Sequence, residues 1–164
     1  MWREIAERNQ LQIPVSELIE QNYKESYRYL SEVEQIPIMP GLVGLLKKLQ
    51  SRKYPMAVAS SSTPEIIDLI LKKTNLKKYF QVIVSAEEAG KSKPEPDVFL
   101  LAAEKLGIKP ANCLVVEDSP NGIKAAKSAG MMCIAYKGPG ADPEKQTAAD
   151  AVIQNYSQLE MMLL

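Results

Sequence analysis

Two adjacent carboxylates follow an apolar run in the second half of this chain. Residues 113–116 read Cys-Leu-Val-Val, and Glu117 and Asp118 come directly after them. Ser119 is predicted to cap a helix that starts with Pro120. Carboxylates at the carboxyl end of a parallel strand lie where open α/β sheets bind their ligands, and two of them beside a helix N-terminus suit a hard cation such as Mg²⁺ next to a phosphate. The alternative is an acidic turn that only caps a helix.

Hydroxyl groups follow another apolar run. Ser60, Ser61 and Ser62 come after Val-Ala at 58–59 and lead into a predicted helix. The Ser60 hydroxyl can donate to a phosphoryl oxygen, and the next backbone N–H groups, beginning with that of Ser61, lack helical partners because a helix starts there. The alternative is a hydroxyl-rich helix cap.

Two lysines lie in a loop that precedes another predicted helix. They are Lys91 and Lys93, and Lys93 is followed by the rigid Pro94. A fixed ammonium group beside a phosphate neutralises charge that develops in a transition state. The alternative is a solvated loop of mixed charge.

Positioning these groups together requires a regular alternation of strands and helices, and the sequence predicts one. Short apolar runs without polar alternation indicate strands buried on both faces of a parallel sheet covered by helices. The expected class is therefore a doubly wound α/β core with a helical N-terminal part, which brings the three groups to one edge of the sheet. The predicted strands are 54–60, 80–85, 112–117, 132–136 and 151–153; the predicted helices are 5–11, 15–33, 42–50, 63–73, 96–106, 120–129 and 156–163.

Composition narrows the functional classes. The 164 residues suffice for one domain plus a small appendage, and 20 basic and 20 acidic residues give zero formal net charge, which argues against bulk attraction to nucleic acid or an anionic membrane. No apolar run is long enough to cross a bilayer. Histidine is absent, so no histidine base or zinc ligand is available in the chain. Cys113 and Cys133 lie in apolar runs, which indicates small buried residues of a cytoplasmic protein.

Three segments together resemble the haloacid dehalogenase-like hydrolases, in particular the small phosphatases and β-phosphoglucomutases with a helical cap. Val-Ala-Ser-Ser-Ser at 58–62 is similar to the family's second motif, with Ser60 at the phosphate-binding position. Gly-Lys-Ser-Lys-Pro-Glu-Pro-Asp-Val-Phe at 90–99 is similar to the third, with Lys93 at the lysine position. Val-Val-Glu-Asp-Ser-Pro-Asn-Gly-Ile at 115–123 is similar to the fourth, with Glu117 and Asp118 at the magnesium positions.

The resemblance implies a mechanism in which an aspartate at the end of the family's first strand attacks a phosphomonoester. An aspartyl-phosphate forms and is then taken up by water or a second hydroxyl, while a second aspartate two residues on acts as acid and base. Mg²⁺ bridges the nucleophile, the phosphate and the carboxylates of the fourth motif. On this basis Ser60, Ser61 and Lys93 are expected to bind phosphate, Lys93 also to act in catalysis, and Glu117 and Asp118 to bind Mg²⁺.

The chain departs from the family at its start. No Asp-x-Asp motif precedes the second motif, and the first aspartate is Asp68, inside a predicted helix. Residues 1–36 resemble the latter part of the family's cap, and 37–164 resemble its core without the first strand, as in a truncated or incompletely recorded polypeptide. That strand lies in the family between the strands predicted here at 54–60 and 112–117. The gap is expected to be filled by an N-terminal segment, by a strand of a second chain, or by collapse of the two strands onto each other.

Two classes of function remain open. The first is a Mg²⁺-dependent hydrolase of small phosphorylated metabolites in the complete form, or alternatively a β-phosphoglucomutase-like phosphosugar mutase. The second is a non-catalytic α/β fragment or interaction module. In both cases the chain alone is expected to be inactive, because the Asp-x-Asp nucleophile motif is absent.

Overall fold

The computed structural model of the chain describes residues 6–10, 12–138 and 148–163. Parallel strands and helices alternate along the chain, as predicted, so the α/β class is confirmed. The helices are α2 (Val15–Glu32), α3 (Leu42–Ser51), α4 (Pro64–Lys73), α5 (Ala86–Ala89), α6 (Asp97–Leu106), α7 (Pro120–Ser128) and α8 (Tyr156–Leu163), with 3₁₀ turns at Lys77–Tyr79 and Pro110–Asn112. The strands are β1 (Ala57–Ser60), β2 (Val82–Ser85), β3 (Leu114–Glu117), β4 (Met132–Tyr136) and β5 (Ala151–Ile153).

The described strands form two separate parallel sheets. One has the order β1-β2, and the other has the order β3-β4-β5. The two strands on either side of the predicted gap, β1 and β3, therefore pair on one side only, each with a strand of its own sheet. They have not collapsed into a common ladder, which is one of the three ways in which the gap was expected to close.

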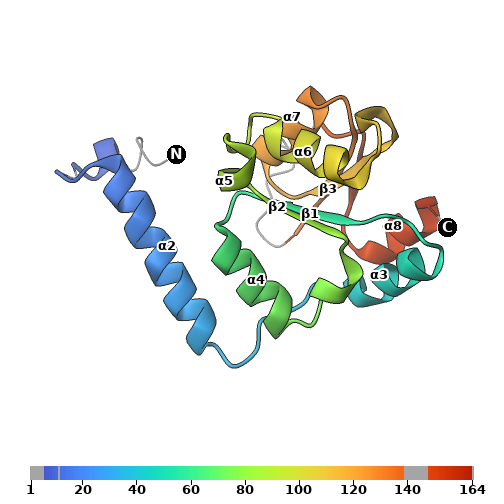
Figure 1. The fold of residues 1–164 in the computed structure, drawn as a ribbon, viewed down its shortest axis with the longest axis horizontal. Helices are drawn as coiled ribbons and strands as arrows, with labels where there is room; N and C mark the ends of the chain where they lie inside the picture. Colours follow the sequence, from blue (N-terminus) through green and yellow to red (C-terminus); the bar gives the residue numbers. More distant parts are fainter. Residues whose placement is uncertain (1–5, 11, 139–147, 164) are drawn as a thin grey trace.

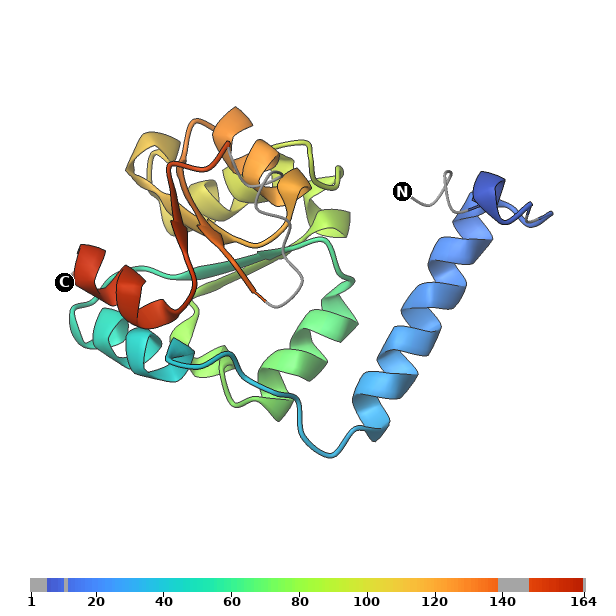
Figure 2. The same ribbon diagram turned by 180° about the vertical axis from the view of Figure 1, so that it is seen from behind.

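Two layers of helices enclose the sheets (Figures 1 and 2). Helices α6 and α7 cover one face, and α3, α4 and α8 lie on the other. Burial is most complete under α6 and α7, where small and branched side chains pack against β2 and β4. The side chains with no exposed surface there include Val84, Val98, Ile123 and Cys133. The continuous apolar strands of the sequence are thus buried between helices, as the parallel-sheet interpretation requires.

Where the limits of an element differ from their predicted positions, they mostly shift inward, for local reasons. Strand β1 starts at Ala57 rather than Tyr54 because Pro55 has no N–H for a ladder. Strand β3 starts at Leu114 because the 3₁₀ turn ends at Asn112. Helix α5 lies in a segment expected to be a loop, where the Ser85 hydroxyl accepts a hydrogen bond from the Glu88 N–H at 3.1 Å. The predicted helix at 5–11 lies partly outside the described residues, of which 6–8 are helical.

Helix α2 stands beside the core rather than on it (Figures 1 and 2). None of its residues is buried. Its C-terminal end is held by the Lys73 ammonium of α4, which donates to the carbonyls of Leu30, Ser31 and Val33 at 2.8, 2.6 and 2.8 Å. A cation at a helix C-terminus satisfies carbonyls that have no helical partner and interacts favourably with the helix dipole. The mid-helix Tyr23 hydroxyl donates to the Ser61 carbonyl at 3.3 Å.

No helix in the described part of the chain has the length and apolar character needed to span a membrane.

Candidate active site

Lys93 joins the carboxyl ends of the two sheets. Its ammonium group donates to the Ala59 carbonyl of β1 at 3.2 Å and forms an ion pair with the Glu117 carboxylate of β3. Its Nζ also lies over the Phe99 ring, 4.6 Å from the centroid. The Lys93 and Glu117 side chains are only 10% and 8% exposed. The structure therefore brings the second, third and fourth sequence motifs to one edge of the fold, as the alternating strands and helices predict.

The Glu117 carboxylate is held from several directions. Besides its ion pair with Lys93, its Oε2 accepts from the Asp118 N–H at 3.0 Å, the Ser119 N–H at 3.1 Å and the Ser119 hydroxyl at 3.0 Å. Burial raises the pKa of Glu117, but the Lys93 charge and the hydrogen bonds outweigh that effect and hold this pKa below its ordinary value. Glu117 is consequently a buried carboxylate that stays ionised at neutral pH.

Two neighbours give the Glu117 side chain its place. Ser119 caps α7, because its hydroxyl oxygen accepts the Gly122 N–H at 3.0 Å while its proton goes to Glu117. Gly122 leaves room for the carboxylate, since a Cβ at that position would overlap the carboxyl group of Glu117. The sequence predicts Ser119 as a cap. The contact with Glu117 and the space left by Gly122 depend on how the side chain folds back over α7, which no spacing rule provides.

The remaining predicted residues lie around this pair. The Ser60 hydroxyl accepts the Ser62 N–H at 3.1 Å at the end of β1. Ser61 is exposed, and its carbonyl accepts from Tyr23 of α2. Asp118, next to Glu117, is exposed to solvent. Lys91, in the same loop as Lys93, is exposed as well. The contact between Tyr23 and Ser61 was not predicted, because it joins residues 38 positions apart on different elements.

The donor set at this edge has the chemistry that Mg²⁺ requires, but it is small. Glu117 and Asp118 supply carboxylate oxygens, which hard cations prefer. Within the described residues no group of three or more histidine, cysteine, aspartate or glutamate side chains is arranged to hold a metal ion. The two carboxylates can therefore supply only part of a metal's ligand set, and both oxygens of Glu117 already have partners, Oε1 in Lys93 and Oε2 in Asp118 and Ser119.

An apolar groove runs between β1 and β3 and ends at this site. Its volume is about 660 Å³, and it extends along both strands, from Tyr54 and Asn112 at one end to Ala59 and Glu117 at the other. Side chains of α6 line one side, and side chains of α3 and α8 line the other. The gap between the two sheets is therefore a groove lined by side chains of both sheets and of the helices on either side.

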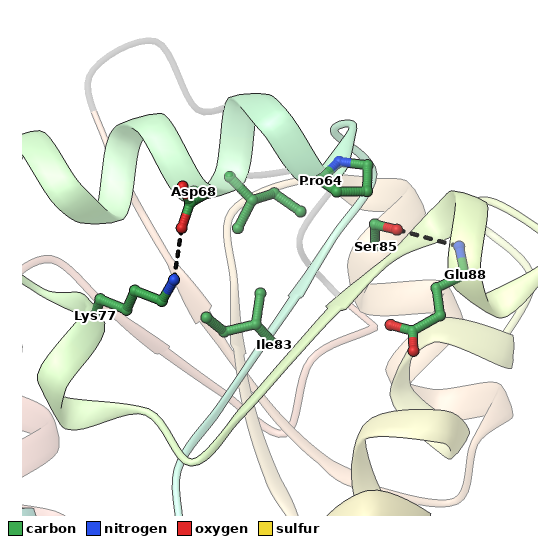
Figure 3. A pocket seen from close by; sticks show the side chains of 7 residues that line it. Pro64, Asp68, Lys77, Ile83, Ser85 and Glu88 are labelled. Carbon is green, nitrogen blue, oxygen red and sulfur yellow. Dashed lines mark hydrogen bonds and ion pairs between the residues drawn. The ribbon is translucent and has the colours of Figure 1, made fainter.

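A second hollow lies between α4, β2 and α5 (Figure 3), with a volume of about 400 Å³. Asp68 lines it and pairs with Lys77 and Lys72, each at 2.6 Å, and hydrogen bonds from these lysines hold the pKa of Asp68 below its ordinary value. Its lining includes none of Ser60, Ser61, Lys93, Glu117 and Asp118. The first aspartate of the chain thus takes part in lysine ion pairs beside this hollow and does not line the groove.

Comparison with known proteins identifies the chain's relatives. The family model of the haloacid dehalogenase-like hydrolases matches residues 1–130. The chain is 37% identical over 134 residues to the bifunctional riboflavin kinase/FMN phosphatase of Arabidopsis thaliana, a match covering 81% of this chain and 35% of that protein. It is 33% identical over 150 residues to the β-phosphoglucomutase of Bacillus subtilis, covering 90% of this chain and 63% of that protein.

Solved structures give the same relationship. A crystal structure of a CbbY mutant from Rhodobacter sphaeroides with xylulose-1,5-bisphosphate superimposes with a TM-score of 0.79 at 25% identity, covering 90% of this chain and 67% of that one. The chain spans 35% of the length of the Arabidopsis relative and 63% of that of the Bacillus relative. It belongs to the haloacid dehalogenase-like hydrolases.

Proposed function

We propose that this chain carries the phosphate-binding and Mg²⁺-binding part of a phosphatase for phosphomonoesters of small metabolites. The observation that carries the proposal is the buried Lys93 ammonium, which contacts both Ala59 and Glu117 at the carboxyl ends of two parallel strands. Relatives named as phosphatases, among them the fructose-1-phosphate phosphatase YqaB of Escherichia coli at 40% identity over 102 residues, support the reaction class.

The phosphate is bound by groups of three elements. The Ser60 hydroxyl, whose oxygen already accepts from Ser62, directs its proton to a phosphoryl oxygen. Ser61 and the N-terminal N–H groups of α4 add donors beside it. Lys93 supplies the positive charge that compensates charge developing on the transferred group.

Glu117 and Asp118 hold Mg²⁺ in this proposal. When bound, the ion acts as a Lewis acid on a phosphoryl oxygen. Glu117 is ready to act as a ligand at neutral pH because its pKa is low, and Ser119 and Gly122 fix the position of its side chain. We assign residues 1–36 to part of a cap, as the family resemblance implies, and the Tyr23 hydroxyl joins α2 to the carbonyl of Ser61.

The cationic side chains on α2 favour a phosphatase over a phosphosugar mutase. A mutase must hold a second phosphate, and Lys24 and Arg28 are the cations of α2. Each is already paired with a glutamate of its own helix, Lys24 with Glu20 at 2.7 Å and Arg28 with Glu25 at 2.5 Å. No cation of α2 is thus directed at a second phosphate by its contacts.

The test is phosphate binding by matched lysine variants, measured by calorimetry with inorganic phosphate and Mg²⁺. Lys93→Met is expected to weaken phosphate binding at least tenfold, while Lys91→Met, in the same loop but exposed, leaves it unchanged. Lys93→Arg keeps the charge and is expected to retain part of the binding. Circular dichroism establishes that each variant is folded. Equal affinity of the Lys93→Met protein and the unmodified chain contradicts the proposal.

A further inference from the structure

We propose that Phe99 is a positioning residue of this site, because the face of its ring holds the Lys93 ammonium group at the carboxyl ends of β1 and β3. The role of Lys93 toward phosphate rests on the proposed function. The contact between the two side chains does not rest on it, and this contact can be tested without any ligand.

The Lys93 ammonium group is held from three sides. A lysine carries three N–H donors. One goes to the Ala59 carbonyl at 3.2 Å, and one goes to the Glu117 carboxylate. The Phe99 ring covers a further side of the ammonium group, with its centroid 4.6 Å from Nζ. The third N–H is therefore the one left for a phosphate oxygen, and the ring helps to fix where it points.

The chain between Lys93 and Phe99 fixes the loop relative to the ring. Pro94 and Pro96 lie between them, and each proline locks one backbone dihedral. The Phe99 N–H bonds the Pro96 carbonyl at 3.0 Å in the first turn of α6. The ring thus stands on a rigid helix end, whereas the lysine has a flexible side chain of four carbons. A fixed ring can therefore restrict the position of the mobile ammonium group.

Burial makes this contact one of the strong kind. Phe99 is 6% exposed, and the Lys93 side chain is 10% exposed. A cation over an aromatic ring is held more tightly when both groups are removed from water. Lys78 shows the contrast, because its Nζ lies 5.4 Å from the centroid of the Tyr79 ring but its side chain is exposed. We therefore expect the Phe99 contact to be measurable in the stability of the chain.

The alternative is that Phe99 only fills space. Its side chain belongs to the core cluster that includes Val98 and Ala102. Replacement by leucine would disturb the packing and the contact with Lys93 together, so it cannot separate the two roles. Fluorine on the ring can separate them. It withdraws electron density from the ring face and adds little volume, which weakens the attraction for a cation and leaves the packing in place.

The experiment places phenylalanine with one, two and three ring fluorines at position 99. Each is studied in the unmodified chain and in the Lys93→Met/Glu117→Gln background, which lacks the buried ion pair. The same series at Phe80, the other phenylalanine of the chain, is the matched control, because Phe80 is half-buried and packs in a different cluster. Urea unfolding without ligand gives the folding equilibrium constant, and calorimetry with inorganic phosphate and Mg²⁺ gives the phosphate affinity.

Each added fluorine at position 99 is expected to lower the folding equilibrium constant when Lys93 is present and to leave it unchanged in the double-variant background. Over the whole series the fall is expected to be about fivefold or more, as for a desolvated cation over a ring. The phosphate affinity is expected to fall in parallel, by about threefold or more. The Phe80 series is expected to show no dependence on Lys93.

A fall that is equal with and without Lys93 overturns the proposal, because it shows that the ring acts through packing alone. A folding constant that does not respond to fluorination overturns it as well. A phosphate affinity that rises or stays unchanged while the folding constant falls shows that the ring does not position Lys93 for phosphate. An unmodified chain that binds no phosphate contradicts the proposed function instead, and the folding constants still decide whether Phe99 holds Lys93.

Discussion

The Lys93 ammonium and the Glu117 carboxylate form a buried ion pair between two sheets that share no hydrogen-bonded strand. Because the pKa of Glu117 lies below its ordinary value, its charge stabilises the fold above the pKa of the unfolded side chain, about 4.3. That contribution is lost as the pH falls through the lower pKa of the folded state. Denaturant unfolding of the chain is expected to show stability that falls as the pH drops below about 4.3.

Glu117→Gln is expected to flatten this dependence. At neutral pH it lowers the free energy of unfolding by about 3–5 kcal/mol, because it leaves the Lys93 charge buried without its partner. The double variant Lys93→Met/Glu117→Gln removes both charges and is expected to recover at least half of that loss. If the stability of Glu117→Gln still falls at acid pH as it does in the unmodified chain, the fall comes from the exposed ion pairs of Asp68 or Asp150 instead.

Two glycines make a matched test of space at the site. Gly122→Ala forces a Cβ into the Glu117 carboxyl group, and such overpacking typically costs about 1–3 kcal/mol. Gly44→Ala, inside α3 with nothing within 4 Å of the added Cβ, is expected to stabilise the chain by about 0.5–1 kcal/mol through helix propensity. Urea unfolding measures both, and a neutral Gly122→Ala would show that Glu117 moves aside without cost.

Mg²⁺ binding is expected to be weak. Two carboxylates and water form a small ligand set, so we expect a dissociation constant of about 10⁻⁴–10⁻³ M, the range of weak divalent-cation sites. Calorimetric titration of the chain and of Asp118→Asn measures it, and the variant is expected to lose the binding. Equal binding by both proteins would remove Asp118 from the site, and sub-micromolar affinity would show that further ligands are present.

The chain alone is expected to show no turnover of p-nitrophenyl phosphate. Ser60, Lys93, Glu117 and Asp118 can position and neutralise a phosphate, but none of them is the nucleophile that the family uses. Removal of a covalent nucleophile leaves only residual electrostatic catalysis. Mg²⁺-dependent hydrolysis that disappears in Lys93→Ala would contradict this expectation and show that another group of the chain attacks phosphorus.

The two thiols are expected to differ in reactivity. Burial raises the pKa of Cys133 to about 11, so almost none of it is thiolate at neutral pH. Cys113 is only half-buried, although burial also raises its pKa. A thiol-disulfide reagent at pH 8 is expected to modify Cys113 in the native chain and to reach Cys133 only after unfolding. Equal rates in Cys113→Ser and Cys133→Ser would show that the core around β4 opens readily.

Patterns along the chain predicted the elements well. Helix α2, strand β4 and strand β5 end within one residue of their predicted limits, because apolar spacing and flanking breakers act locally. Helix α5 escaped prediction because four residues are too few for a periodic pattern, and Ala-Glu-Glu-Ala resembles a charged loop.

The arrangement of the site was harder to predict. The meeting of Lys93 with Glu117 followed from strand topology, but the Ala59 and Phe99 contacts depend on tertiary packing. A gap between two strands was expected from the sequence. The helix side chains that line the groove were not, because they belong to segments far apart in sequence. Hydrogen bonds such as that from Tyr23 to Ser61 have no signal in the local sequence, so they are seen only in the folded structure.

The Lys73 ammonium holds α2 by three carbonyls that all lie at one end of the helix. Mechanically, such an attachment is a pivot, restrained part-way along the helix by the hydrogen bond from Tyr23 to Ser61. The 18 residues of α2 extend about 27 Å at 1.5 Å per residue, so a tilt of about 10° at Lys73 moves the far end by about 5 Å. Small displacements of α4, the helix that follows the serine loop, are therefore amplified at the tip of α2.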